Sequence, residues 1–376
     1  MRSHTDDVLG FSLDGIRRHL TTASADGTLR VWSMDSLEQL YDFVSMDKPC
    51  SVAFHPHEPT FACGFSSGTV RVFDISSARL LAEHKQHRGE VVGLAFSSDG
   101  DLMFSADSDG SLVLHDATEE EHSVIRVACS VVARGTERAP DALAVSGDSS
   151  RLAFVGPTPH IVTVADARSL DELLHVDVSI LDVESSELDS ALKVRFSPAS
   201  AEHLLVATSA NKILWISTKT GRLLRQVSGV HKRPCSSLAV SEDRRFLLTS
   251  GHNTVKVWDY KRTNQVNPQM YIGHSQPIRQ VSFTPDQLGV VSVGDAVFLW
   301  DFLAEPDECV MGVRSQFKAS YSVPLPADGE VNAAQLSNGM PRQAAPLPSS
   351  QHQLDVSAMD PEIQGGTLVK TNSKLF

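Results

Sequence analysis

The chain has 376 residues, of which 41% are hydrophobic, and a formal net charge of −13 at pH 7. This composition predicts a soluble globular protein with a sizeable core, and it argues against general nucleic-acid binding, which needs clustered positive charge. The five cysteines are odd in number and form no CxxC pair, so neither a disulfide framework nor a zinc site is indicated. With no signal peptide and no apolar run of membrane-spanning length, we expect a reducing compartment and no membrane partner.

From Val8 onward the chain repeats a unit of short apolar strand patterns separated by turn residues. Each unit has a closing position in its third strand pattern, at Trp32, Phe73, His115, Ala165, Ile216, Trp258 and Trp300. These positions are 41, 42, 50, 51, 42 and 42 residues apart. The last residue of each first strand keeps the same period, at Phe11, Phe54, Phe96, Val145, Phe196, Val240 and Phe283. Two independent landmarks with one period predict seven copies of one structural unit.

The seventh unit, Gly273–Asp301, opens with Gly-His and closes with Trp-Asp. This signature with a period near 42 resembles the WD40-repeat family over residues 5–312. The resemblance implies an all-β fold: a seven-bladed propeller of four-stranded antiparallel blades over residues 5–313. The physical interpretation agrees, because strands that cannot bury both faces alone are buried when blades stack radially.

In chain order, the turns Asp14-Gly15 and Asp26-Gly27 predict hairpins in the first unit. The third unit is expected to end at Val124 and the fourth to begin at Ile125. The fifth unit carries Trp215 one residue before its closing position. Cys50 and Cys235 stand at apolar first-strand positions and are predicted to be small core residues.

Ring closure is the open question at the sequence level. Propellers of this family usually close with an N-terminal strand, and nothing before Val8 is long enough to supply one. Either Cys309–Val313 provides the outer strand of blade 7, or the ring closes poorly, or the chain is part of a longer array; we favour the last. Residues 314–376, rich in Ser, Pro, Gln, Ala and Asn, are expected to be a disordered tail or linker.

The resemblance also implies a buried hydrogen-bond network of His, Ser or Thr, Asp and Trp in each blade. Candidates for it are Ser24, Asp26 and Trp32 in blade 1, His87, Ser105 and Asp109 in blade 3, Trp258 in blade 6, and His274 and Trp300 in blade 7. Blade 1 shows no His in register, and blade 7 has Gly294 where the Asp is expected, so no blade is expected to be complete. We interpret these residues as structural, because a satisfied polar network needs no catalysis to explain it.

No catalytic constellation stands out. The chain has no P-loop and no helix-opening GxGxxG motif. The pair His55-Pro56-His57 has metal-ligand spacing, but in a turn it is more often solvated. We therefore predict a non-enzymatic protein with no catalytic residue, no cofactor and no metal, whose partners are other proteins.

The candidate partner-binding surface is the narrow top face of the ring, formed in this family by the loops that precede each first strand. Those loops carry the cations Lys48, Arg88, Arg134, Arg138, Lys232 and Arg233. On an acidic chain, a positive face would attract an acidic peptide or tail. The alternative is that these are ordinary solvated charges, partly cancelled by Glu90 and Glu137.

The stretches Leu29–Phe43, Pro49–His55 and Ile272–Leu303 resemble a family of large WD-repeat proteins of the centriole and cilium. The resemblance implies a centriole-wall scaffold needed for cilium assembly, located in the cytoplasm, at the cytoskeleton, centrosome and cilium base. Members have a further N-terminal domain, proposed to contact microtubules, and more than one propeller; we do not expect that N-terminal domain within these 376 residues. The alternative is a WD40 adaptor, such as a signalling hub or a ubiquitin-ligase substrate receptor. The latter is disfavoured because Lys261 stands where the Trp-Asp-x-Arg pattern requires Arg.

Overall fold

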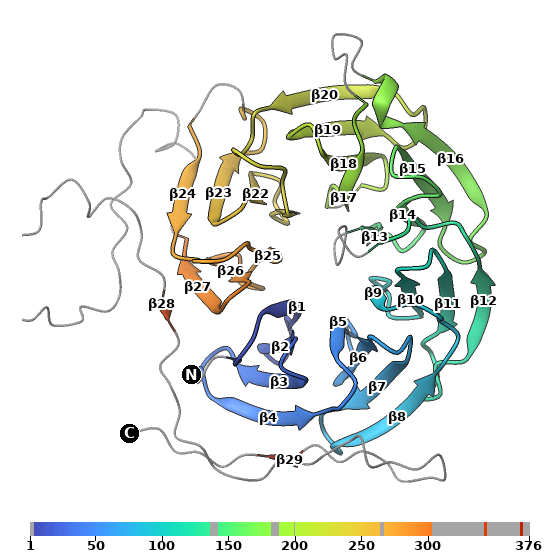
Figure 1. Ribbon diagram of the computed structural model, residues 1–376, viewed down its shortest axis with the longest axis vertical. Helices are drawn as coiled ribbons and strands as arrows, with labels where there is room; N and C mark the ends of the chain where they lie inside the picture. The colour runs from blue at the N-terminus through green and yellow to red at the C-terminus, as the bar shows by residue number, and fades with distance from the viewer. Residues whose placement is uncertain are drawn as a thin grey trace, which may run out of the picture.

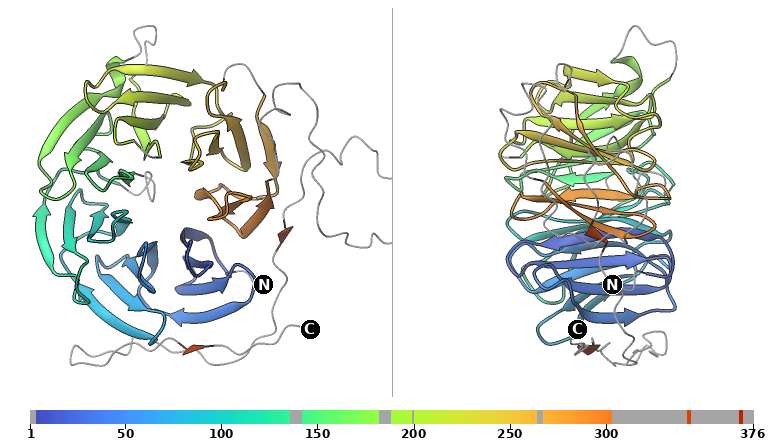
Figure 2. Two further views of the ribbon diagram at one scale, coloured as in Figure 1. Left: turned by 180° about the vertical axis from the view of Figure 1, so that it is seen from behind. Right: turned by 90° about the vertical axis from the view of Figure 1, so that its left-hand side faces the viewer.

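A computed structural model describes residues 4–135, 142–181, 188–198, 200–263 and 267–302, together with the backbone of two short strands at 342–343 and 369–370. Its strands form seven antiparallel sheets arranged radially around a central axis (Figure 1). Seen from the side, the ring is a squat cylinder with two end faces (Figure 2). The seven-bladed all-β propeller predicted from the repeat is thus confirmed.

Blades 1 to 3 contain β1 (Val8–Asp14), β2 (His19–Ser24), β3 (Thr28–Ser33), β4 (Gln39–Val44); β5 (Pro49–Phe54), β6 (Thr60–Phe65), β7 (Val70–Asp74), β8 (Arg79–His84); β9 (Val91–Phe96), β10 (Leu102–Asp107), β11 (Leu112–Asp116) and β12 (Val124–Ala128). Blades 4 and 5 contain β13 (Leu143–Val145), β14 (Arg151–Val155), β15 (Ile161–Asp166), β16 (Glu172–Asp177); β17 (Ala191–Phe196), β18 (His203–Thr208), β19 (Lys212–Ser217) and β20 (Leu223–Ser228). Blades 6 and 7 contain β21 (Ser237–Val240), β22 (Phe246–Ser250), β23 (Thr254–Asp259), β24 (Gln269–Ile272); β25 (Gln280–Phe283), β26 (Gly289–Val293), β27 (Val297–Asp301) and β28 (Arg342–Gln343).

The remaining elements are β29 (Val369–Lys370), which adds a fifth strand to blade 1, and a one-turn 3-10 helix, η1 (Val178–Ile180). Within the described ranges no helix is long and apolar enough to cross a membrane.

The seven closing positions occupy equivalent places in the blades. Trp32 lies opposite Leu20, His115 opposite Met103, and Trp300 opposite Val290. Each partner is the second residue of its blade's second strand. The repeat period therefore predicted the register of the third strands, even where the closing residue is not Trp.

One predicted blade boundary was wrong. Residues from Ile125 onward were assigned to blade 4, but β12 pairs with β11 and is the outer strand of blade 3. The acidic run Glu119–Glu121 lies in the turn between these two strands, not after the blade. This long turn accounts for part of the 50-residue spacing between His115 and Ala165. Because the turn is longer than in blades 1, 2, 4 and 5, the outer strand begins later than expected, and the predicted end of blade 3 fell too early.

The ring closes directly between blades 1 and 7. Val8 and Phe11 pack with Val291 and Val293 in one buried apolar cluster. The amide of Val8 donates to the carbonyl of Gly294 at 2.7 Å. The expected alternative of a poorly closed ring is therefore not what the structure shows. Cys309–Val313, one candidate for the outer strand of blade 7, lies outside the described residues, and in the structure β28 occupies that position.

Three of the four cysteines in the described residues are buried. Cys50 and Cys235 lie in the core as predicted, and Cys63 is fully enclosed. Burial raises the pKa values of the Cys50 and Cys63 thiols well above the usual range. Cys129 is exposed.

Candidate partner-binding face

Strand direction divides the connections of the ring between two end faces. The loops that lead into each first strand and the turns between second and third strands lie on one end, the top face. The turns between first and second strands and between third and fourth strands lie on the other, the bottom face. This follows from the antiparallel order of the strands in every blade.

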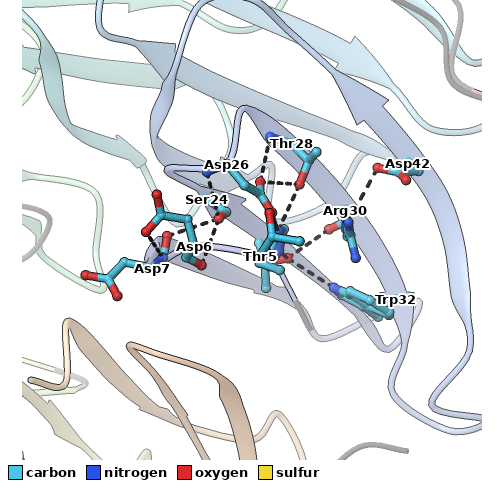
Figure 3. A network of polar contacts seen from close by, with 11 residues as sticks. Thr5, Asp6, Asp7, Ser24, Asp26, Thr28, Arg30, Trp32 and Asp42 are labelled. Atoms are coloured by element: carbon cyan, nitrogen blue, oxygen red, sulfur yellow. Dashed lines mark hydrogen bonds and ion pairs between the residues drawn. The ribbon is translucent and has the colours of Figure 1, made fainter. Parts of the chain in front are cut away.

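Blade 1 carries a complete buried network on its top side. His4 hydrogen-bonds through Nε2 to Thr22 Oγ1 at 2.7 Å, and its Nδ1 lies 3.2 Å from a carboxylate oxygen of Asp26. The indole of Trp32 donates to Thr22 at 3.1 Å. Figure 3 shows Asp26, Thr28 and Trp32 converging there.

Two sequence expectations for blade 1 therefore need correction. A histidine is in register, His4, but it follows Ser3 and so lacks the Gly-His signature. The hydroxyl of the network belongs to Thr22 and not to Ser24. Ser24 is the last residue of β2 and donates to the carbonyls of Asp6 and Asp7 instead, which holds the entering loop (Figure 3).

Blade 3 uses a different acid from the one predicted. His87 bonds to Ser105 at 2.6 Å and to Asp107 at 3.1 Å, and Ser105 bonds to His115 at 3.1 Å. Asp107 ends β10 and is fully buried, whereas Asp109 lies exposed in the turn beyond it. Burial works to raise the pKa of Asp107, but hydrogen bonds with His87 and Ser111 outweigh it and lower the pKa to about 2.

Blade 7 is also complete, contrary to expectation. His274 bonds to Ser292 at 2.8 Å and to Asp295 at 2.7 Å, and the Trp300 indole donates to Ser292 at 2.8 Å. The acid comes one residue after Gly294, because the turn between β26 and β27 brings the carboxylate of Asp295 to the Nδ1 atom of His274.

Blade 6 has a shorter version of the same network. His231 and the Trp258 indole both bond to Thr249 at 2.9 Å. Burial, helped by the nearby charge of Lys256, lowers the pKa of His231 to about 3. These histidines are therefore held by their neighbours in the blade. Among the residues described, no group of three or more His, Cys, Asp or Glu side chains could hold a metal ion.

The predicted top-face cations fall into two sectors of the ring. Lys48, Arg88 and Arg134 lie on the loops entering blades 2, 3 and 4, while Lys232 and Arg233 lie on the loop entering blade 6. Blades 3 and 6 face each other across the ring (Figure 1). Arg138 lies outside the described residues.

These cations differ in how they are held. Lys48 forms an ion pair with Glu90 at 3.4 Å, and the Arg134 side chain packs beside Gly110. Arg88, Lys232 and Arg233 are exposed, and no ion pair within the described ranges involves them. They are therefore the top-face charges most available to a partner, and they are a subset of those predicted.

Acidic side chains lie among the cations on the same face. Asp7 pairs with Arg279 at 3.3 Å where blades 7 and 1 meet, and Asp47 accepts hydrogen bonds from Ser66 and Ser67 beside blade 2. The top face is therefore patterned rather than uniformly positive. A partner with positive and negative segments has a preferred orientation on it.

The bottom face carries a set of bonds that join neighbouring blades, which the sequence analysis did not anticipate. Within the described residues a hydrogen bond or ion pair crosses each of the seven junctions: Arg17 to the His57 carbonyl (3.1 Å), His55 with the Gly100 carbonyl (2.9 Å), the Asp99 amide to Ser149 (3.0 Å), Arg151 to the Thr218 carbonyl (3.3 Å), Arg225 to the Tyr260 carbonyl (2.7 Å), the Glu242 amide to Gln287 (3.1 Å), and Arg18 with Asp286 (3.4 Å).

Comparison with known proteins places this geometry in a family. Residues 12–301 match the family model described as WDR90/POC16, second beta-propeller. The chain belongs to the WDR90/POC16 family. It is 52% identical over 366 residues to WD repeat-containing protein 90 of Xenopus tropicalis, covering 95% of this chain and 20% of that protein. It is 47% identical over 378 residues to the human protein of that name, covering 99% of this chain and 21% of that protein.

A more distant relative carries a different name. Centriole proteome protein 16 of Chlamydomonas reinhardtii is 27% identical over 264 residues, which cover 66% of this chain and 12% of that protein. The chain thus spans about a fifth of the length of the WD repeat-containing protein 90 relatives. The name of the algal relative refers to the centriole, and the family match identifies the chain as a propeller of the WDR90/POC16 family.

Proposed function

We propose that this propeller is a non-enzymatic protein-interaction scaffold of the centriole wall, needed for cilium assembly. On this proposal it binds an acidic segment of a partner protein through Arg88, Lys232 and Arg233. The observation that carries the proposal is that these three cations are exposed on one face and form no ion pair with any residue that the structure describes. The histidines and carboxylates beneath them are occupied in structural networks.

The location in the proposal rests on the family and on the name of the algal relative. A binding role is supported by the state of His87, Asp107 and His231, which are buried and hydrogen-bonded to other side chains of the blades and so are not presented to a substrate. Charge complementarity gives such a face orientation and association rate more than raw affinity. Binding is therefore expected to weaken as salt is added.

The experiment measures binding of a fluorescent glutamate-rich peptide by anisotropy at low and physiological salt. One variant reverses the top-face charges, Arg88→Glu/Lys232→Glu/Arg233→Glu. The matched control reverses three exposed bottom-face cations, Arg79→Glu/Lys261→Glu/Arg262→Glu. We expect the first variant to lose at least about tenfold in affinity, and the control to bind like the wild type. Equal loss in both variants would show that net charge alone drives binding and would refute the proposed site.

The location is tested separately. The same two variants, placed in the full-length protein with a fluorescent tag, are imaged at centrioles. The proposal predicts that the wild type and the control concentrate there and that ciliated cells are fewer with the top-face variant. A wild type that does not concentrate at centrioles contradicts the centriole part of the proposal, whatever the peptide result.

A further inference from the structure

The two most exposed large hydrophobic side chains among the described residues lie on the top face. Met46, on the loop entering blade 2, is 81% exposed, and Leu188, on the loop entering blade 5, is 78% exposed. A single exposed apolar residue on a protein surface needs no explanation. These two, however, occupy equivalent positions in their blades, and the same surroundings occur twice.

In blade 2, one turn connects the loop of Met46 to the loop that enters the next blade. Asp47 follows Met46 and accepts hydrogen bonds from the hydroxyl of Ser66 at 2.9 Å and from the following amide at 3.1 Å, in the turn between β6 and β7. The same turn passes so close to the loop entering blade 3 that a Cβ atom at Gly68 would lie 2.5 Å from the carbonyl oxygen of His87.

Blade 5 repeats this arrangement. Asp189 follows Leu188 and accepts hydrogen bonds from the hydroxyl of Ser209 at 3.0 Å and from the following amide at 2.9 Å, in the turn between β18 and β19. Two residues beyond Ser209, the side chain of Asn211 accepts a hydrogen bond at 3.1 Å from the amide of His231, on the loop entering blade 6. Each turn thus holds an exposed apolar residue next to the loop that enters the following blade.

Exposed cations come next on both of those following loops. Arg88 follows His87, and Lys232 and Arg233 follow His231, and both histidine rings are buried in the networks described above. The three cations are exposed and form no ion pair with any residue that the structure describes. The top face therefore presents an apolar side chain and positive charge on adjoining, fixed loops in two places, at blades 2 and 3 and, across the ring, at blades 5 and 6 (Figure 1).

We propose that each place is one binding site for a partner segment that has an apolar side chain beside acidic side chains. Met46 and Arg88 form one site, and Leu188, Lys232 and Arg233 form the other. This inference rests on the proposed function, since the cations are the same, and it adds the apolar contact and the number of sites. The charges give orientation and salt dependence, whereas burial of an apolar side chain adds affinity that salt does not screen.

The test compares two peptides of equal length and equal net charge by fluorescence anisotropy, at low and at physiological salt. One peptide contains glutamate and serine, and in the other leucine replaces each serine. The variant Met46→Ser/Leu188→Ser removes both top-face apolar side chains. The matched control, Ile16→Ser/Leu288→Ser, removes two exposed apolar side chains from the bottom face.

We expect the wild type and the control to bind the leucine peptide about tenfold more tightly than the serine peptide, because leucine side chains become partly buried. This ratio should persist as salt is added, although both affinities fall. The Met46→Ser/Leu188→Ser protein should bind both peptides equally, with an unchanged affinity for the serine peptide.

Each other result has a distinct meaning. Equal binding of the two peptides by the wild type would overturn the inference and leave the proposed function standing. A leucine preference that survives in the Met46→Ser/Leu188→Ser protein would overturn the assigned residues. Binding of neither peptide would refute the proposed function, and this inference with it.

The number of sites is measured by calorimetric titration with the leucine peptide. We expect two peptides to bind each wild-type chain and one peptide to bind tightly to each single variant, Met46→Ser or Leu188→Ser. One peptide per wild-type chain would overturn the duplicated site.

Discussion

The guanidinium carbon of Arg225 lies 3.8 Å from the centroid of the Trp215 ring, so the planar cation stacks on this indole. Trp215 is the tryptophan that stands one residue before the closing position of its blade. From there the guanidinium group donates to the carbonyls of Tyr260 and Lys261 in blade 6, at 2.7 and 3.1 Å. One side chain thus stacks on blade 5 and is bonded to blade 6.

Arg225→Lys is expected to lower the free energy of unfolding by about 1–2 kcal/mol, because lysine keeps the charge but loses the flat stacking surface and the fork that reaches two carbonyls. Urea unfolding followed by circular dichroism measures it. The control is Arg222→Lys at an exposed position three residues earlier. Equal midpoints for both variants would contradict the assigned role.

The hydroxyl of Ser292 serves two buried partners, the His274 ring and the Trp300 indole. Ser292→Ala leaves the Nε2 atom of His274 and the indole N–H of Trp300 without a hydrogen bond, so we expect a loss of about 2–3 kcal/mol in unfolding free energy. The same substitution at exposed Ser98 should change it by less than about 0.5 kcal/mol. A thermal melt in which the two variants match would show that water replaces the lost hydroxyl.

A methyl group at Gly64 has no room. Its Cβ would lie 2.4 Å from Val91 Cγ1 on the neighbouring blade 3, in a strand that lies in the core. Gly64→Ala is therefore expected to destabilise the ring by about 1–3 kcal/mol through overpacking. At Gly10 the added Cβ meets its nearest atom at 3.6 Å, so Gly10→Ala should be close to neutral. The measurement is the melting temperature of each variant. A Gly64→Ala protein that melts at the same temperature as Gly10→Ala would contradict the tight packing between blades 2 and 3.

Acid should weaken the contact between blades 2 and 3. Burial, and next the charge of His84, lowers the pKa of His115 to about 3, from an ordinary value of 6.5. Since the folded pKa is the lower one, the unfolded chain binds more protons between these values, and stability falls as the pH drops from about 6.5 towards 3.

The measurement is unfolding free energy against pH for the wild type and His115→Gln. Between pH 6.5 and 4.5 the variant should lose about 2 kcal/mol less than the wild type, because each unit of pKa difference is worth about 1.4 kcal/mol. His203→Gln, at an exposed position, should follow the wild-type curve. Parallel curves for all three proteins would mean that His115 does not remain neutral in the folded state.

The repeat period predicted which residues lie in the third strands. It did not predict network residues whose positions are set by the path of a loop. The period placed Phe73 and Ala165 in third strands although neither is Trp. It could not reveal His4, which lacks the preceding glycine, or Asp295, which lies one residue beyond the expected position. Both are fixed by the path of a loop, which a pattern of residue types does not encode.

The bottom-face bonds were missed for another reason: each joins residues of two different units. Two of the bottom-face bonds nevertheless follow the period: Arg17 lies 40 residues from His57, and His57 bonds at 3.1 Å to the carbonyl of Ser98, 41 residues on. Others do not, such as the bond between Arg151 and Thr218, which are 67 residues apart. A search for polar residues at equivalent turn positions in successive units would find the first two pairs. Their bonding partners, mostly backbone carbonyls, still require the structure.

The buried cysteine thiols can be used to measure local opening of the ring. Cys50 and Cys63 lie in blade 2, and Cys235 lies on the loop entering blade 6. All three thiols are buried, so each reacts with an alkylating reagent only when the structure around it opens. Burial also keeps the Cys50 and Cys63 thiols protonated, because it raises their pKa values. Exposed Cys129 labels at once and calibrates the reagent. Timed alkylation of the unmodified chain therefore compares how often blade 2 and blade 6 open locally, without adding any probe.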